Sequence, residues 1–288
     1  MDSQTVLITG ATDGLGKALA TCFAATGARV ILHGRSAQRC DEARWQIARA
    51  TGNAHLETCV ADFARLGDVF AMIGEMKRRA PAIDLLINNA GLGVEPTRTT
   101  SEDGYEMVLQ VNYLATYALS LGLAREVGHA SGRIVCVSSL SQAPVQFDDP
   151  NYEYQWEGPQ SYGRSKWAQI AFAAGMAAFG GRTAPVICSL HPGSFMPTKL
   201  VLGKYPVVDT LETGVNTVWL AARHPLDDCN GAYFDSQGIS RAIDEAYNPA
   251  IQQQLLDLSA GMIAAIPGSD AVPHWRSVAA SPEPMAMS

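Results

Sequence analysis

The feature that most constrains this chain is a regular alternation of short apolar runs, rich in β-branched residues, with longer amphipathic segments. The apolar runs predict strands at Thr5–Thr9, Arg29–His33, His55–Ala61, Ile83–Ile87, Arg133–Ser138, Pro185–Leu190 and Ala232–Phe234. The segments between them predict helices near 15–26, 37–51, 65–79, 104–127, 161–179, 210–222 and 240–264. Strands this apolar are buried on both faces, and intervening helices form right-handed crossovers. The pattern predicts an α/β fold with one doubly wound parallel sheet of about seven strands and helices on both faces.

The sequence also predicts one domain. No linker or repeat interrupts residues 1–266, and 47% hydrophobic with 17% charged residues suits a compact body. From Pro267 the chain becomes rich in Pro, Gly and Ser, so we expect 267–288 to be a mobile tail.

Charge and hydropathy exclude several classes of protein. The net charge of −7 opposes nucleic-acid binding, which needs a basic patch. The longest uncharged apolar stretch, 170–179, is about half of the ~20 residues that span a bilayer, and no basic region precedes Thr5. The six cysteines and six histidines have no metal-ligand spacing, so we expect no metal site. These features indicate a cytoplasmic protein with no integral membrane segment.

A glycine-rich segment follows the first predicted strand. It reads Thr9-Gly10-Ala11-Thr12-Asp13-Gly14-Leu15-Gly16-Lys17. Glycines allow a sharp strand-to-helix turn and a close approach of the backbone to a ligand, and the helix N-terminus offers free N–H groups to an anion. We expect Gly10, Thr12, Gly14, Leu15 and Gly16 to bind the pyrophosphate of a dinucleotide, although such a loop could also be only a tight turn.

The end of the second predicted strand bears on the choice of cofactor. NAD sites place a carboxylate there for the ribose 2′-hydroxyl, but this chain has Arg35 followed by Ser36. A guanidinium pairs with the 2′-phosphate of NADP, which a carboxylate would repel. Arg35 and Ser36 therefore predict NADP(H); Lys17 could add positive potential, whereas Asp13 opposes it.

A tyrosine and a lysine stand four residues apart in Tyr162-Gly163-Arg164-Ser165-Lys166. At the start of a helix they share one face, and a cation near a phenol favours its ionised form. Upstream, Ser138-Ser139 ends a strand, Asn88-Asn89-Ala90-Gly91 ends another, and Asn112 lies in a predicted helix. Carboxyl ends of parallel strands meet at the ligand-binding edge of such sheets.

These motifs together resemble the short-chain dehydrogenase/reductase family, from Thr5 to about Phe234. The resemblance rests on 9–16, Asp62, 88–91, 111–112, 137–139, 162–166 and 191–193. It implies a Rossmann fold and an oxidoreductase acting on CH–OH or C=O groups. The gap of 23 residues between Ser139 and Tyr162 and the His before Pro192 are similar to the branch that contains retinol dehydrogenases.

The resemblance also implies roles for individual residues. Tyr162 would exchange the proton, Lys166 would lower the pKa of Tyr162 and hold the nicotinamide ribose, Ser139 would bind the substrate oxygen and Asn112 would hold a water. Further cofactor contacts are expected from Asp62, Asn89, Ala90, Gly91, Pro192, Gly193, Phe195 and Thr198, the last being one residue later than in the family pattern.

Two loops bear on the substrate. The segment 195–205 contains several apolar residues and resembles the family's mobile lid, which favours a lipophilic carbonyl or alcohol as substrate. Aromatic residues at 147, 152, 154 and 156 either line an apolar pocket or pack their own loop on the body.

One set of large apolar and aromatic residues in two predicted helices could form a homodimer face or belong to the core: Tyr113, Tyr117, Leu121, Trp167, Phe172 and Met176.

The sequence thus predicts an NADPH-dependent reductase of a hydrophobic ketone or aldehyde. Two alternatives stay open at this point: an NAD-dependent alcohol dehydrogenase, which Arg35 disfavours, and a non-catalytic NADP(H)-binding sensor or scaffold, which the presence of Ser139, Tyr162 and Lys166 disfavours.

Overall fold

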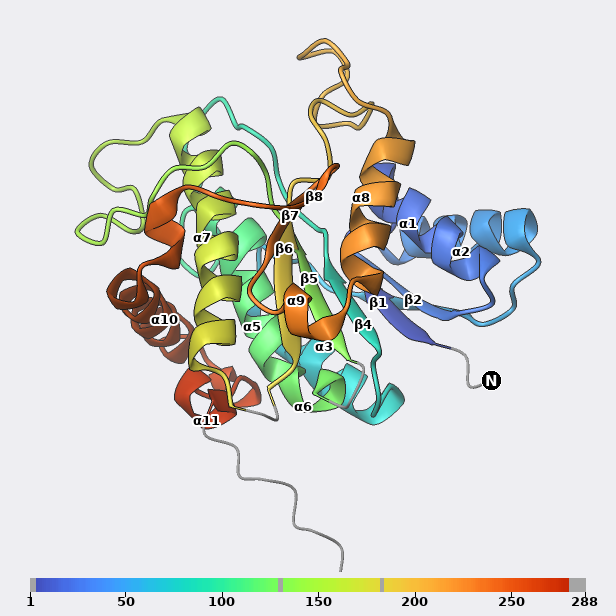
Figure 1. Cartoon of the computed structure of the whole chain (residues 1–288), viewed down its shortest axis with the longest axis horizontal. Coiled ribbons are helices and arrows are strands. Elements are labelled where there is room, and N and C mark those ends of the chain that lie inside the picture. The colour runs from blue at the N-terminus through green and yellow to red at the C-terminus, as the bar shows by residue number, and fades with distance from the viewer. Residues whose placement is uncertain (1–3, 129–131, 182–183, 280–288) are drawn as a thin grey trace, which may run out of the picture.

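The computed structural model describes residues 4–128, 132–181 and 184–279, and they form one sheet with helices on both faces (Figure 1). The strand order is β3-β2-β1-β4-β5-β6-β7-β8, parallel except for the last pair. The strands are β1 (Thr5–Ile8), β2 (Arg29–Gly34), β3 (Leu56–Val60), β4 (Leu85–Asn88), β5 (Arg133–Val137), β6 (Val186–Leu190), β7 (Tyr233–Asp235) and β8 (Gly238–Ser240).

The larger helices cover the sheet in two groups, each with its own buried core. On one face lie α1 (Gly14–Ala25), α2 (Ala37–Thr51) and α8 (Leu211–Arg223). On the other lie α3 (Leu66–Arg79), α5 (Ala115–Gly122) and α7 (Gly158–Phe179), with α10 (Pro249–Ala264) packed outside them. Shorter elements are α4 (Met107–Leu109), α6 (Ala124–Val127), α9 (Leu226–Cys229), α11 (Trp275–Ala279) and the 3₁₀ turns Asp244–Tyr247 and Ser269–Ala271.

The predicted doubly wound α/β fold is confirmed, with one strand more than expected. The strand β8 has only three residues and pairs antiparallel with β7. The predicted helix over 240–264 is therefore wrong in its first part. Pro249, which has no N–H to give, opens α10 instead, and the side chain of Asn248 caps that helix by accepting from the N–H groups of Ala250 and Ile251.

The helix predicted over 104–127 is also interrupted. A π-helical turn, Gln110–Leu114, separates α4 from α5. The carbonyl of Asn112 in this turn accepts from Gln169 Nε2 on α7 and from Thr116 Oγ1, each over 2.8 Å. Such turns often occur at functional sites, and this one carries Asn112.

The C-terminal segment packs on the domain, in place of the tail expected from residue 267. Trp275 in α11 is buried, its ring lies 5.7 Å from that of Phe179, and its Nε1 donates to Asp257 Oδ1 over 3.0 Å. Residues 280–288, the rest of the expected tail, lie outside the described residues.

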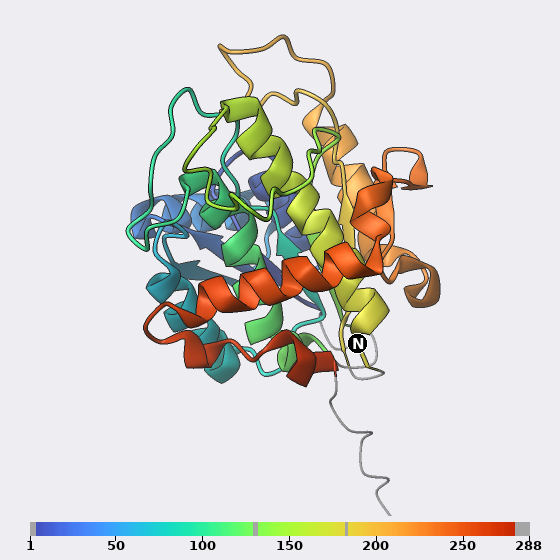
Figure 2. The same ribbon diagram turned by 90° about the vertical axis from the view of Figure 1, so that its left-hand side faces the viewer.

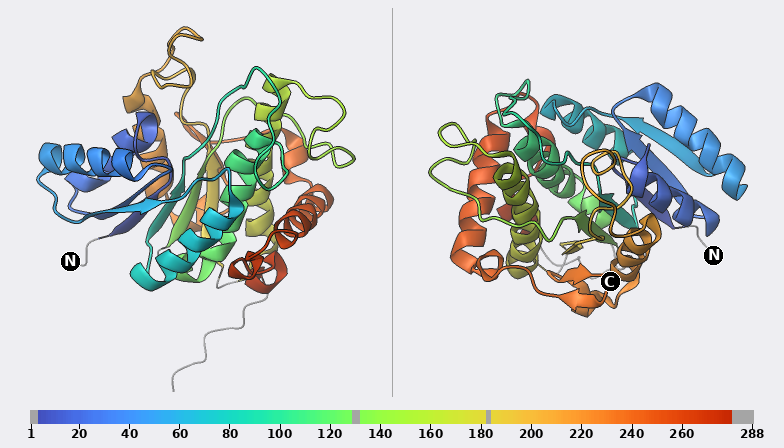
Figure 3. Two further views of the ribbon diagram at one scale, coloured as in Figure 1. Left: turned by 180° about the vertical axis from the view of Figure 1, so that it is seen from behind. Right: turned by 90° about the horizontal axis from the view of Figure 1, so that it is seen from above.

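The carboxyl edge of the parallel strands carries the long loops. Figure 3 (right) looks onto this edge, where the loops after β4, β5 and β6 come together above the strands. The loop between β6 and α8, residues 191–210, rises highest above the sheet in Figure 1. The sequence motifs at 88–91, 137–139 and 191–193 therefore meet at one edge.

Candidate active site

The turn between β1 and α1 can be made only with glycine at two of its positions. Gly10 has φ +66°, and a Cβ there would lie 2.9 Å from the Cα of Ala90. A Cβ on Gly16 would lie 2.2 Å from the carbonyl oxygen of Gly10. The turn and the neighbouring β4 loop thus pack backbone to backbone, and the free N–H groups of α1 point to this edge. These features fit a binding site for the pyrophosphate of a dinucleotide.

His33 on β2 holds this turn through a hydrogen bond to its backbone, a role that was not predicted from the sequence. The Gly10 N–H donates to Nδ1 of His33 over 3.3 Å, and Nε2 lies 3.0 Å from the carbonyl of Ala61. The ring is therefore neutral with its proton on Nε2, stacked on Phe63 at 4.4 Å. Burial lowers the pKa of His33 to about 4. Its signal in the sequence was a histidine inside an otherwise apolar strand.

The loop after β4 is tied to the same turn. Thr9 Oγ1 accepts from the N–H groups of Asn89 and Ala90, each over 2.9 Å, and Asn89 Nδ2 donates to the carbonyl of Thr9 over 2.9 Å. Gly91 follows, and a Cβ there would lie 3.1 Å from Asn112 Oδ1. Residues 89–91 therefore line the gap between the glycine-rich turn and the side chains of the π-helical turn.

The predicted 2′-phosphate residues lie at the end of β2. Arg35 is exposed, and Ser36 caps α2 by accepting from the Arg39 N–H over 3.4 Å. Arg39 itself reaches the glycine-rich turn, with Nη2 3.4 Å from Asp13 Oδ2. Arg39, in the first turn of α2, was not among the residues predicted from the sequence. Asp62 lies at the end of β3, where its carboxylate accepts from the N–H of Ala64 over 3.1 Å.

The side chains of Thr12 and Leu15 pack against protein. A Cβ on Gly34 would lie only 2.6 Å from Thr12 Cγ2, so the Thr12 side chain needs glycine at position 34. Leu15 is buried, and its Cδ1 would lie 2.9 Å from a Cβ on Gly214. A cofactor contact from Leu15 would accordingly use its backbone.

Ser139 and Tyr162 meet at the carboxyl edge of β5. The hydroxyl of Ser139 neighbours the Tyr162 side chain and accepts from the Ser141 N–H over 3.1 Å. Burial raises the pKa of Tyr162, and the neighbouring Ser139 hydroxyl partly offsets this rise. The phenol is therefore protonated at neutral pH and can donate a proton to a substrate oxygen.

Lys166 lies one helical turn after Tyr162 and is buried. Its Nζ donates to the carbonyl of Val137 over 2.9 Å and to Gln169 Oε1 over 3.3 Å, and lies 5.8 Å from the centre of the Tyr162 ring. Burial lowers the pKa of Lys166 to about 8. In this geometry the ammonium lies beside the Tyr162 ring while it donates to the Val137 carbonyl.

Asn112 is held on the opposite side of the site. Its Nδ2 donates to Ser165 Oγ over 2.9 Å and to the carbonyl of Leu92 over 3.1 Å, while its Oδ1 accepts from the Leu92 N–H over 2.7 Å. Every hydrogen-bonding atom of the amide is engaged. Asn112 thereby fastens the loop after β4 to α7.

The backbone of Ser139 is supported by β7, which the sequence analysis did not foresee. Tyr233 OH donates to the Ser139 carbonyl over 3.1 Å, and Gln142 Nε2 donates to the same carbonyl over 3.2 Å. On the other side, His191 Nδ1 accepts from the Leu140 N–H over 3.2 Å. Burial lowers the pKa of His191 and keeps it a neutral acceptor.

The loop from Pro192 to Val208, which we call the lid, begins beside this network. Gly193 has φ +152°, and the next N–H, that of Ser194, donates to Asp209 Oδ2 over 2.6 Å. Phe195 has φ +46° and packs its exposed ring 5.2 Å from Tyr205. Thr198 lies against the glycine-rich turn, its Cγ2 being 3.1 Å from a Cβ built on Gly14. Exposed apolar side chains gather on the lid at 195, 200, 202, 205, 207 and 208.

The loop 142–157 mostly packs on its own domain. This supports the interpretation that its aromatic residues pack the loop on the body, and not the one that they line an apolar pocket. Tyr152 is buried with φ +54°, and Arg98 Nε donates to its carbonyl over 2.8 Å. Trp156 Nε1 donates to the buried carboxylate of Glu106 over 3.2 Å. Only Tyr154, 82% exposed, is free of such packing among these aromatics.

The fold and the site together define a class of protein: a doubly wound α/β domain with a glycine-rich turn and a Ser–Tyr–Lys group at the same sheet edge. The family described as short chain dehydrogenase matches residues 4–202. The chain belongs to this family.

Its relatives include reductases and dehydrogenases. A Streptomyces protein described as the daunorubicin C-13 ketoreductase DnrU is 34% identical over 277 residues, covering 91% of this chain and 93% of its own. Human retinol dehydrogenase 14 is 32% identical over 298 residues, covering 91% of this chain and 87% of its own.

Solved structures agree on the fold. An uncharacterised protein from Mycobacterium paratuberculosis has a TM-score of 0.67 at 24% identity, over 90% of this chain and 92% of its own. A Beutenbergia cavernae protein described as an NAD(P)-dependent gluconate 5-dehydrogenase with bound NADP has a TM-score of 0.55 at 29% identity, over 68% and 74%.

Within residues 4–128, 132–181 and 184–279, no three His, Cys, Asp or Glu side chains are grouped to hold a metal ion. In the same ranges, no helix has both the length and the apolar character needed to cross a bilayer.

Proposed function

We propose that the protein is an NADPH-dependent oxidoreductase that reduces a ketone or aldehyde group of a hydrophobic substrate, with alcohol oxidation as the reverse reaction. One observation carries this proposal: the half-buried phenol of Tyr162 neighbours the Ser139 hydroxyl, and the Lys166 ammonium lies 5.8 Å from the centre of its ring. A neutral phenol next to a second hydroxyl is suited to protonate a carbonyl oxygen.

The residues of the chain would divide the work as follows. Ser139 donates a hydrogen bond to the substrate oxygen and orients it, and Tyr162 gives that oxygen its proton. Lys166 stabilises the phenolate that remains, and Asn112 keeps the loop after β4 fixed beside them. When bound, the nicotinamide supplies a hydride to the carbonyl carbon, so that one hydride and one proton convert C=O into CH–OH.

The preference for NADPH rests on the charge at the end of β2. Arg35 is exposed there with Ser36 beside it, and no carboxylate occupies the end of this strand. A relative solved with NADP supports the same cofactor class. Arg35→Asp should invert or abolish the preference for NADPH over NADH, measured by fluorescence titration of both cofactors. An unchanged ratio of the two dissociation constants would contradict this assignment.

The class of substrate rests on the lid. Its outer residues are apolar and exposed, Val208 at 64% and Leu202 at 55%, beside the edge that carries Tyr162. Such surface is retained where it covers an apolar ligand. The relatives named for a ketoreductase and for retinol oxidation support a lipophilic carbonyl or alcohol. A panel of apolar ketones and aldehydes, with NADPH oxidation followed by absorbance, tests this.

Tyr162→Phe tests the mechanism. It removes the proton donor and keeps the ring, so turnover should fall by about 10²- to 10⁴-fold while the dissociation constant for NADPH stays unchanged. Tyr154→Phe, at the 82% exposed tyrosine of the neighbouring loop, is the matched control and should leave turnover intact. Retention of most activity in Tyr162→Phe would contradict the role of Tyr162.

The wild-type protein distinguishes the proposed function from its alternatives. Tight NADPH binding without turnover on any substrate would favour a sensor or scaffold, and tighter binding of NADH would favour an NAD-dependent alcohol dehydrogenase.

A further inference from the structure

The glycine-rich turn contains a carboxylate that the proposed function does not use. Asp13 precedes α1, and its Oδ1 accepts from the Gly14 N–H over 2.8 Å. Its Oδ2 is contacted by two cations from other elements: Lys199 Nζ on the lid at 2.5 Å and Arg39 Nη2 on α2 at 3.4 Å. One oxygen atom therefore links the cofactor turn, the lid and the start of α2.

This carboxylate meets the positive charge at the N-terminus of α1. The N-terminus of a 12-residue helix carries a partial positive charge that favours an anion, and here the charge is met by Asp13. The hydrogen bond from Lys199 lowers the pKa of Asp13, and burial offsets part of that shift. Asp13 is thus ionised at neutral pH and neutralises the two cations in the free protein.

The positions of the two cations indicate which anion they can take instead. Arg39 lies in the first turn of α2, directly after the Arg35-Ser36 pair at the end of β2. Lys199 follows Thr198, which lies against Gly14. Both cations therefore border the space between the glycine-rich turn and the end of β2, where the 2′-phosphate of the cofactor is expected.

Breaking the ion pairs of Asp13 with Lys199 and Arg39 costs little free energy, because none of the three side chains is deeply buried. The side chain of Lys199 is 72% exposed, that of Asp13 45% and that of Arg39 41%. Ion pairs this exposed stabilise a protein only weakly, and salt weakens them further. A phosphate monoester, with close to two negative charges, competes well for such cations.

We propose that Asp13 is a resident counter-ion that holds Arg39 and Lys199 in the free protein and yields them to the 2′-phosphate of the bound cofactor. Asp13 thereby sets how strongly the protein discriminates NADP(H) from NAD(H). Through Lys199 the same exchange joins the lid to the bound phosphate. This inference rests on the proposed function, since it requires a phosphorylated nicotinamide cofactor.

Asp13→Asn is the informative substitution because asparagine caps a helix as well as aspartate and keeps an oxygen for the Gly14 N–H. Two probes isolate the phosphates: adenosine 2′,5′-bisphosphate, which carries the 2′-phosphate, and ADP, which does not. We expect Asp13→Asn to bind the 2′,5′-bisphosphate about 3- to 10-fold more tightly than the wild type at low salt, with a smaller change for ADP. Lys199→Met should weaken binding of the 2′,5′-bisphosphate.

A double-mutant cycle distinguishes a counter-ion from a simple structural contact. If Asp13 neutralises Lys199, then Lys199→Met must weaken binding of the bisphosphate more in the Asp13→Asn background than in the wild type. If the pair only fastens the lid, Lys199→Met causes no further change in binding of the bisphosphate once Asp13→Asn is present. The controls are Asp41→Asn on exposed α2, which has the same charge change, and Lys204→Met on the exposed part of the lid.

Unchanged or weaker binding of the bisphosphate by Asp13→Asn would overturn the inference, as would equal gains for both probes. Titration of wild-type protein with NADPH and NADH separates this failure from that of the proposed function. Binding of NADPH by the wild type with no effect of Asp13→Asn overturns the counter-ion alone. A wild type that binds neither cofactor and neither probe overturns both.

Discussion

His33 is the side chain on which the glycine-rich turn rests. It accepts from the Gly10 N–H only while Nδ1 is unprotonated, and burial lowers its pKa from 6.5 to about 4. Between these two values the unfolded chain binds a proton that the folded chain does not. The free energy of unfolding should therefore fall as pH falls from about 6.5 to about 4, by on the order of 3 kcal/mol.

His33→Asn tests this dependence, since its side chain can accept from the Gly10 N–H but does not titrate. We expect the acid side of the stability–pH profile, measured by urea unfolding at several pH values, to become shallower than in the wild type. His274→Asn, on an exposed side chain, is the control. Equal slopes for His33→Asn and the wild type between pH 4 and 6.5 would contradict the role of His33.

At this scale the sequence predicted residues that belong to contiguous motifs and missed those that act across the fold. Ser139, Tyr162 and Lys166 stand in recognisable order along the chain. Arg39 and Tyr233 do not, because their contacts with Asp13 and with the Ser139 carbonyl arise only when distant elements are brought together. No local pattern encodes such contacts.

The element that most depends on its glycines is the turn from β1 into α1. A Cβ on Gly16 would lie 2.2 Å from the Gly10 carbonyl oxygen, which is backbone and cannot move aside cheaply. Gly16→Ala should therefore destabilise the fold by about 1–3 kcal/mol or more, the cost of an overpacked core position, and abolish NADPH binding. Thermal unfolding and fluorescence titration measure both effects.

Gly74→Ala in α3 is the matched control for Gly16→Ala. Its Cβ would make only an ordinary contact of 3.6 Å with the flexible end of Arg78. Because alanine is the better helix former, this variant should be stabilised by up to about 1 kcal/mol. Equal effects of the two substitutions would show that the clash at Gly16 is relieved by backbone movement.

Whole strands and helices were predictable where hydrophobic periodicity or apolar runs are long, as in β2 and α3. The prediction failed where tertiary contacts override local preference. In the π-helical turn at Gln110–Leu114, the Asn112 carbonyl accepts from Gln169 on α7, and β8 pairs with the edge of β7. Neither cause is local in the sequence.

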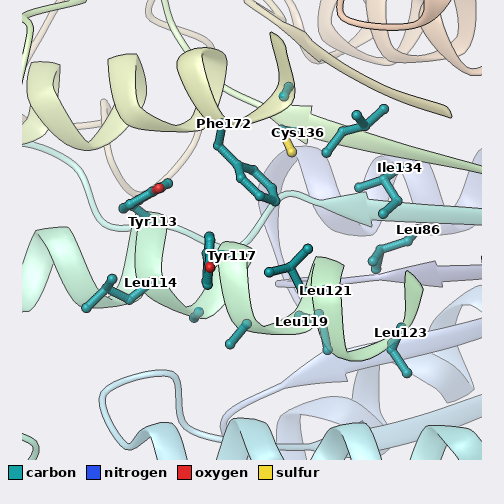
Figure 4. Close-up of a cluster of buried hydrophobic side chains, with 14 of the residues drawn as sticks. Leu86, Tyr113, Leu114, Tyr117, Leu119, Leu121, Leu123, Ile134, Cys136 and Phe172 are labelled. Atoms are coloured by element: carbon teal, nitrogen blue, oxygen red, sulfur yellow. The ribbon is translucent and has the colours of Figure 1, made fainter. Parts of the chain in front are cut away.

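At the scale of the whole molecule, the aromatic face of α5 and α7 is covered by the chain itself. Tyr113, Tyr117 and Phe172 form one buried cluster, with ring centres 5.3–6.4 Å apart (Figure 4). Figure 2 shows α10 crossing in front of α7 and α5. The Tyr113 hydroxyl lies 2.7 Å from Ser259 Oγ on α10, and Tyr117 OH donates to the Leu256 carbonyl over 3.5 Å. Of the two sequence interpretations of this face, the structure supports the core.

A homodimer through this face would require α10 to leave the apolar surface that it covers. Leu255, Leu256 and Ile263 of α10 are almost fully buried, and exposing each would cost about 1.5–3 kcal/mol. We therefore expect a monomer at micromolar concentration, measured by sedimentation velocity. Ser259→Ala leaves the buried Tyr113 hydroxyl without its partner, so it should lower the free energy of unfolding by about 1–3 kcal/mol without changing the sedimentation coefficient. Gln253→Ala, on the exposed side of α10, should change neither. A wild-type dimer that dissociates in Ser259→Ala would show instead that this face mediates association and that α10 moves to allow it.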